Sequence, residues 1–112
     1  MDDKIKCIYT INCNDPKITE FYIGSTTNLK SRKYQHKSDC NNSNTQVYNC
    51  KLYKFIRNNG GYDNWFFVIE EDCKDLNKHE ILELEEIYLD LLNPPLNTLK
   101  KSNQIPKWVF IK

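Results

Sequence analysis

The chain has 112 residues, of which 39% are hydrophobic and 12% aromatic, so it fits one globular domain with its own core and not a disordered protein. Its five cysteines lack metal-ligand spacing and no apolar run resembles a signal peptide or membrane span, so we expect an intracellular protein, cytoplasmic or nuclear, without a zinc site. The net charge is only +1, but residues 1–60 sum to +5, residues 61–97 to −8 and residues 98–112 to +4, which permits either a bipolar surface or simply well-solvated charges.

Hydrophobic periodicity and turn residues predict six regular elements. In chain order they are strands at 4–11 and 19–24, helices at 29–37 and 48–58, a central buried strand at 65–69 and a helix at 77–93. Turn-forming residues join the first two strands as a hairpin, and the polar residues 38–44 are expected to form a loop. In the last helix Asn77 and Glu80 occupy the two positions of a capping box, and Pro94 prevents the helix from continuing.

This order, β-β-α-α-β-α, predicts an α+β fold in which a small three-stranded antiparallel sheet is flanked by helices. We assign residues 1–97 to the domain and residues 98–112 to a C-terminal tail. Within the tail, residues 107–112 (KWVFIK) suit either a short edge strand or a segment packed on the domain by its aromatic side chains.

One carboxylate of the last helix lies on its apolar side. A helical wheel of about 100° per residue groups the apolar side chains into one stripe: Ile81, Leu84, Tyr88, Leu91 and Leu92. Glu85 lies about 40° from the first of them and inside the stripe. A buried carboxylate needs a cation, a metal or hydrogen-bond donors, which makes Glu85 a candidate ligand. A stripe-edge glutamate that reaches water or a structural arginine explains the same pattern.

The helix at 29–37 carries a basic group and a proton-transfer group on one face. Arg32 and His36 are four residues apart and therefore neighbours on the helix, with Lys30, Lys33 and Lys37 around them. Arginine binds phosphodiesters through bidentate hydrogen bonds, and histidine exchanges protons near neutral pH. The lysines suit contacts to a nucleic-acid backbone. A basic surface helix with an incidental histidine is the alternative.

Two tyrosines and a glycine mark the predicted hairpin. Tyr9 lies on the first strand, and Tyr22 precedes Gly24 at the end of the second. Tyrosine is a good strand former, so core packing explains either residue alone. The glycine permits a close backbone approach at the strand-to-helix turn. A free phenol has a pKa near ~10, so either tyrosine would need a nearby cation to act as a base.

Taken together, these segments resemble the signature of the GIY-YIG endonucleases. The pattern comprises Ile8-Tyr9, then Tyr22-Ile23-Gly24, then Arg32 followed by His36. Residues 52–65, 84–90 and 95–97 resemble the later family segments in the same order, so the likeness runs from Ile5 to Asn97. Cys7 stands where the family name has glycine; it is small and apolar and suits a strand, but it alters the packing beside Tyr9.

The resemblance implies a role for each matched position. Glu85 would be the single protein ligand of a divalent metal, Mg²⁺ or alternatively Mn²⁺, and Arg32 would stabilise charge on the scissile phosphate. Tyr9, Tyr22 and His36 would position water and move protons, with Tyr9 as the preferred base. Gly24 would allow close approach of the substrate.

Asn97 is expected to brace the site by hydrogen bonds, and the lysines of the basic helix are expected to contact DNA. The function that follows is metal-dependent hydrolysis of DNA phosphodiester bonds. The alternatives are a catalytically inactive nucleic-acid-binding module and an interaction domain whose basic helix binds an acidic protein. No separate DNA-reading domain is recognisable, so specificity is expected to come from substrate shape, a homodimer or a partner protein.

Overall fold

The computed structural model describes residues 4–98 and contains a three-stranded sheet with three α-helices. The elements are β1 (Cys7–Cys13), β2 (Phe21–Thr26), α1 (Leu29–Asn41), α2 (Lys51–Asn58), the short 3-10 helix η1 (Tyr62–Asn64), β3 (Trp65–Asp72) and α3 (Lys78–Leu92). The α+β fold class and the element order are therefore confirmed. The predicted segment at 107–112 lies outside the described residues.

The sheet has the order β2-β1-β3 and is antiparallel throughout. The prediction that residues 65–69 form a central buried strand is wrong, because β1 is central and β3 is an edge strand. Trp65 and Phe67 pack against the core, whereas Phe66 and Val68 on the other face are 43% and 38% exposed. An apolar run has the same periodicity in a buried strand and in an edge strand, so periodicity could not separate the two.

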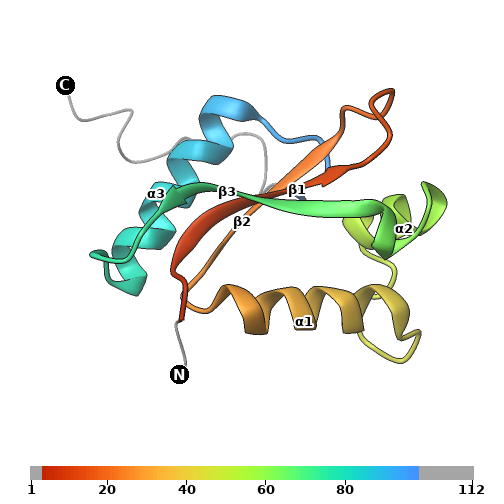
Figure 1. Cartoon of the computed structure of the whole chain (residues 1–112), viewed down its shortest axis with the longest axis horizontal. Coiled ribbons are helices and arrows are strands. Elements are labelled where there is room, and N and C mark those ends of the chain that lie inside the picture. Colours follow the sequence, from red (N-terminus) through yellow and green to blue (C-terminus); the bar gives the residue numbers. More distant parts are fainter. Residues whose placement is uncertain (1–3, 99–112) are drawn as a thin grey trace.

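The sheet lies between two layers of helix (Figure 1). Tyr9 and Ile11 of β1 point into a core formed with α1 and α2. Ile8 and Ile23 point to the opposite face and pack against α3. This alternation follows from the period of two in a strand, and it sends neighbouring residues of β1 into different cores.

The helix α1 is longer than predicted, because residues 38–41 continue it instead of forming a loop. Cys40 is fully buried, and Arg57 Nη1 donates a hydrogen bond of 2.7 Å to its carbonyl oxygen. Tertiary contacts therefore override the weak helix propensity of this polar segment. The Arg57 guanidinium also stacks on the Tyr48 ring, 3.6 Å from its centre. The predicted start of the second helix at residue 48 is wrong, because α2 begins at Lys51 and Tyr48 lies in the stretch before it.

The helix α3 begins and ends as predicted. Asn77 and Glu80 form both hydrogen bonds of the capping box, and Asn93 ends the helix in the left-handed conformation. The apolar stripe is confirmed only in its first part, since Ile81 is buried while Leu91 and Leu92 are 70% and 47% exposed. No helix in the described part of the chain is long and apolar enough to cross a bilayer.

Candidate active site

A buried chain of hydrogen bonds joins β1, α1 and α2. His36 Nε2 lies 2.7 Å from Tyr9 Oη, and His36 Nδ1 lies 2.7 Å from Tyr53 Oη. Arg32 Nε donates a hydrogen bond of 3.2 Å to Tyr9 Oη. Tyr9 and His36 are 0% and 2% exposed, so these bonds hold their rings in one arrangement. The predicted neighbours Tyr9, Arg32 and His36 are thus in direct contact.

Tyr22 and Gly24 of β2 complete this side of the site. The Tyr22 ring lies 6.5 Å from the Tyr9 ring and 5.8 Å from the His36 ring, centroid to centroid. Gly24 pairs with Tyr9 in the sheet register, and a side chain there would overlap the Tyr9 phenol. Glycine is therefore required at position 24 to make room for a tyrosine side chain.

Burial controls the protonation of the two groups in contact. It lowers the pKa of His36 from 6.5 to about 3, with the positive charge of Arg32 as a second cause, so the ring is neutral at physiological pH. Burial also raises the pKa of Tyr9 well above its usual value; Tyr22 raises it further, and Arg32 opposes the shift. The resting state of Tyr9 is therefore the neutral phenol.

Glu85 reaches the site from the other face of the sheet. It is half-buried on α3, and its Oε1 accepts a hydrogen bond from the hydroxyl of Ser25 at the end of β2. Beyond the dominant effect of burial, its negative charge raises the pKa of both Tyr9 and Tyr22. The carboxylate therefore lies within electrostatic range of both phenols, with β2 between the two groups.

Asn97 fastens the segment after α3 to the outer edge of β2. Its Nδ2 donates to the Ile23 carbonyl (2.8 Å), and its Oδ1 accepts from the Ile23 amide (2.9 Å). The Leu96 amide also donates to the Phe21 carbonyl at 3.2 Å. These bonds satisfy backbone groups that an edge strand would otherwise leave open. Asn97 therefore fixes the strand that carries Tyr22 and Gly24 through the backbone of Ile23.

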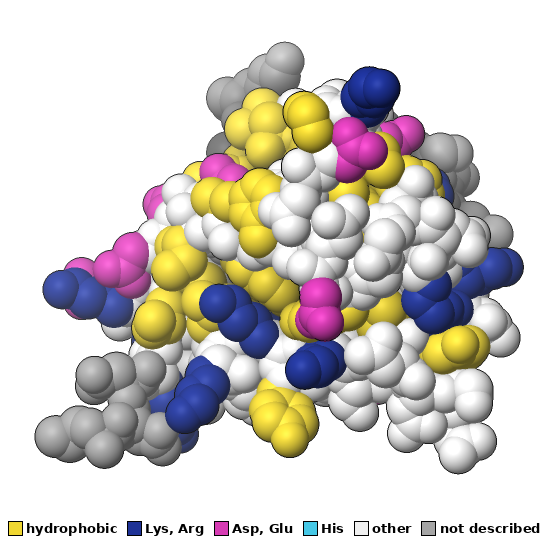
Figure 2. Space-filling view, turned by 45° about the vertical axis from the view of Figure 1, so that its right-hand side comes forward, with side chains coloured by type: hydrophobic (Ala, Val, Ile, Leu, Met, Phe, Trp, Pro, Cys, Tyr) yellow, Lys and Arg dark blue, Asp and Glu magenta, His cyan; other side chains and the backbone are white. Residues whose placement is uncertain are grey.

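The three predicted DNA-contacting lysines are exposed on α1. Lys33 Nζ lies 5.4 Å from the centre of the Phe67 ring, a geometry that suits a cation–π contact. On the face drawn in Figure 2, hydrophobic side chains lie among basic and acidic ones, and Lys and Arg side chains gather along its lower half. The exposed lysines of α1 supply positive charge of the kind that contacts to a nucleic-acid backbone use.

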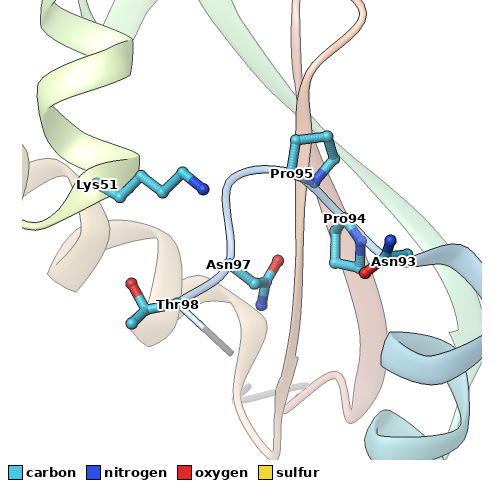
Figure 3. Close-up of a pocket in the computed structure, with 6 residues that line it drawn as sticks. All are labelled: Lys51, Asn93, Pro94, Pro95, Asn97 and Thr98. Atoms are coloured by element: carbon cyan, nitrogen blue, oxygen red, sulfur yellow. The ribbon is translucent and has the colours of Figure 1, made fainter. Parts of the chain in front are cut away.

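An open pocket of about 500 Å³ lies beside the site. Its lining residues are Lys51, Asn93, Pro94, Pro95, Asn97 and Thr98. Lys51 extends from α2 toward the segment that carries Pro95 and Asn97 (Figure 3). None of these lining residues belongs to the hydrogen-bonded cluster, and Asn97 is linked to it only through the Ile23 backbone, so the pocket is a neighbour of the candidate site and not its centre.

Comparison with known proteins identifies the family. A family model described as the GIY-YIG catalytic domain matches residues 5–100. The chain belongs to the GIY-YIG family. A similar solved structure, the catalytic domain of the homing endonuclease I-TevI, superposes with a TM-score of 0.68 at 20% identity, covering 85% of this chain and 99% of that one. No curated protein sequence gives a match.

GIY-YIG catalytic domains are typically endonucleases and generally depend on a metal. The structure brings four of the predicted side chains, Tyr9, Tyr22, Arg32 and His36, into one cluster. Asn97 acts on it through β2.

Sequence reasoning missed Ser25 and Tyr53, which contact Glu85 and His36 directly. Ser25 follows Gly24 in the signature and faces the same side as Ile23, so strand alternation was a usable signal for it. Tyr53 had none, because it lies on a different helix, 17 residues from His36.

Proposed function

We propose that this GIY-YIG domain is a metal-dependent DNA endonuclease that hydrolyses phosphodiester bonds with Arg32, Tyr9 and Glu85. The observation that carries the proposal is the convergence of Arg32 and His36 on the Tyr9 hydroxyl, with the Tyr22 ring 6.5 Å from the Tyr9 ring and the Glu85 carboxylate within electrostatic range. Hydrolysis of a phosphodiester needs a proton acceptor, a cation for the phosphate and a stabilised leaving oxygen, and these residue types can supply each of them.

Arg32 supplies the fixed positive charge. Its Nε is engaged with Tyr9 and its Nη1 donates a long hydrogen bond of 3.4 Å to Gln35 Oε1. These two bonds orient the guanidinium, and Nη2 is the terminal nitrogen left for a phosphate oxygen among the described residues. The guanidinium stays protonated at all working pH values, so it stabilises the charge that develops on the phosphate. The same charge favours the ionised form of Tyr9 and so couples the two roles.

Glu85 fits a divalent cation of the magnesium type. Within residues 4–98 no group of three or more His, Cys, Asp or Glu side chains is close enough to enclose a metal. Mg²⁺ needs no such cage, because it keeps several waters and binds through one or two carboxylates together with substrate phosphate. Bound to Glu85, such an ion would polarise the phosphate and neutralise the leaving oxygen. Ser25 holds the carboxylate in place from the side of β2.

Tyr9 is the group we assign as the proton acceptor. As a phenolate it would take one proton from the attacking water while the new P–O bond forms, the bond to the leaving oxygen breaks and solvent protonates that oxygen. Neutral His36 cannot supply positive charge, but it can donate one N–H to the Tyr9 oxygen. Because burial raises the pKa of Tyr9, cleavage is expected to increase with pH above neutrality.

The test is nicking of supercoiled plasmid with Mg²⁺, Mn²⁺ or a chelator. The wild-type protein is expected to nick DNA with either ion and to stop when the chelator removes it. Glu85→Gln keeps the shape but loses the charge and should slow cleavage at least ~10²-fold. Glu86→Gln, the exposed neighbour, is the matched control and should cut as the wild type does. Equal cleavage by both variants, purified in parallel, would remove Glu85 from the mechanism.

A further inference from the structure

The histidine of the site has a hydroxyl on each ring nitrogen. Tyr9 Oη and Tyr53 Oη each lie 2.7 Å from His36, on Nε2 and Nδ1 respectively. All three residues are at least nine-tenths buried. Tyr9 lies on β1, His36 on α1 and Tyr53 on α2, so each side chain is positioned by a different element.

A neutral imidazole carries one N–H and one lone pair, so the two hydroxyls must play opposite roles. In one arrangement Tyr9 donates to Nε2, and Nδ1–H donates to Tyr53. In the other, Tyr53 donates to Nδ1, and Nε2–H donates to Tyr9. Which nitrogen of a histidine carries the proton is set by the hydrogen bond at the other nitrogen.

Only the second arrangement prepares Tyr9 to act as a base. In the first, the Tyr9 hydrogen is tied to the imidazole. In the second, the N–H groups of Arg32 and His36 both point at the Tyr9 oxygen, and the Tyr9 hydrogen is not bonded to the imidazole. Hydrogen bonds donated to a charged form favour that form.

We propose that Tyr53 is a positioning residue of this site, whose hydroxyl donates to His36 Nδ1 and so keeps the ring proton on Nε2, directed at the Tyr9 oxygen. The inference rests on the proposed function for its catalytic meaning, but the tautomer it assigns exists whether or not the protein cuts DNA. The role parallels that of groups in other enzymes that orient a histidine without touching substrate.

The titratable groups near Tyr9 lie on three different elements of the fold. The titratable groups that act on Tyr9 are Tyr22 of β2, Arg32 and His36 of α1, and Glu85 of α3. Burial raises the pKa of Tyr53; the charges of Asp39, Cys50 and Tyr22 raise it further, and Arg32 opposes the shift. Replacing Tyr53 by phenylalanine leaves every one of these groups in place and removes only the bond to Nδ1. A shift in the titration of Tyr9 can then be assigned to that bond.

The first experiment reads the tautomer by ¹⁵N NMR of histidine ring nitrogens in the full chain. His79, the other histidine and an exposed one, serves as internal reference. We expect the Nε2–H tautomer of His36 in the wild type and a loss of this preference in Tyr53→Phe. A wild-type ring protonated on Nδ1, or an unchanged tautomer in the variant, would overturn the proposal even if the protein is an active nuclease.

The second experiment compares single-turnover cleavage across pH. Tyr53→Phe should move the rising limb up by about one pH unit, which means about tenfold slower cleavage on that limb and convergence with the wild type at high pH. Tyr62→Phe is the matched control, because the Tyr62 hydroxyl also bonds to α1, at the Lys33 carbonyl (3.0 Å), but does not reach His36. A uniform loss at all pH values, or superimposable profiles, would contradict a positioning role.

Discussion

The two faces of the sheet contribute to the candidate site in different ways. On the α1 side, Tyr9 and His36 are buried and each is bonded to two other side chains. On the α3 side, Glu85 is half-buried, and Ser25 is its hydrogen-bond partner within residues 4–98. The first face holds groups whose protonation must be controlled, whereas the second presents a carboxylate with lone pairs left for a cation.

This difference shows where preorganisation is needed. Proton transfer depends on orientation and pKa, which burial and fixed hydrogen bonds determine. A metal that keeps most of its waters needs one accessible oxygen and tolerates a less enclosed site. Substitutions on the α1 side should therefore change pH dependence and geometry, and substitutions of Glu85 should change metal dependence.

The largest effect is expected from Arg32→Ala. This change removes the phosphate-binding charge and the donor to Tyr9 together, so single-turnover cleavage should fall about 10³-fold. Arg32→Lys should restore only part of it, because lysine lacks the planar fork. Thermal unfolding midpoints within a few degrees of the wild type would show that the fold is intact. Cleavage by Arg32→Ala within tenfold of the wild type would mean that the α1 face is not catalytic.

Gly24→Ala comes next. The added Cβ would overlap the Tyr9 phenol, so the ring must shift from the position in which it bonds to Arg32 and His36. Cleavage should fall about 10²-fold, since a misplacement of about 1 Å can cost that much. Gly61→Ala is the control: its new Cβ meets no atom within 4 Å, although φ is +81°. It should lose stability, about 1 kcal/mol, without losing catalysis. Equal catalytic rates for the two variants would contradict the steric argument.

The third prediction concerns stability against pH. His36 has a pKa of about 3 in the folded chain and 6.5 as its ordinary value, chiefly because of burial. Below pH 6.5 this histidine becomes protonated in the unfolded chain but stays neutral in the folded chain. Its contribution to the free energy of unfolding is therefore fully present above pH 6.5 and is lost progressively as the pH falls toward 3. The slope approaches at most about 1.4 kcal/mol per pH unit, tenfold in the unfolding equilibrium.

Urea unfolding from pH 7 to pH 4 measures this slope. His36→Gln should lose its part of the decrease, and His79→Gln, at an exposed position, should keep it. Parallel curves for the wild type and His36→Gln would show that the buried imidazole is not responsible. That result would weaken the contrast between a closed α1 face and an open α3 face.

The smallest effects are expected at the lysines of α1. Alanine at Lys30, Lys33 or Lys37 should weaken DNA binding only a few fold each, because each lysine neutralises at most one phosphate. The slope of log affinity against log salt should decrease by about one for each phosphate that is no longer neutralised. Lys17→Ala, in the connection between β1 and β2, is a control for nonspecific charge. An unchanged salt slope would place the DNA elsewhere.

The hairpin, the capped last helix and most residues of the cluster could be predicted from the sequence, because they depend on local signals. Strand alternation, a capping box and a short motif each lie within a few residues of one another. Burial depends on what the rest of the chain provides. Phe66 and Leu91 fit apolar patterns yet remain exposed, since no helix or strand within residues 4–98 covers them. The contact between Tyr53 and His36 could not be predicted for the same reason, because it forms only where α1 and α2 pack together.

The amide of Asn97 has a practical consequence for anyone who trims or fuses this domain. One side chain there occupies both hydrogen-bonding groups of Ile23, much as a neighbouring strand would. A version of the protein that stops at the end of α3 would keep Glu85 and every side chain of the hydrogen-bonded cluster, and would still leave the backbone groups on the outer edge of β2 without these partners. Any shortened derivative should therefore end beyond position 97, and a fused module should be joined after it.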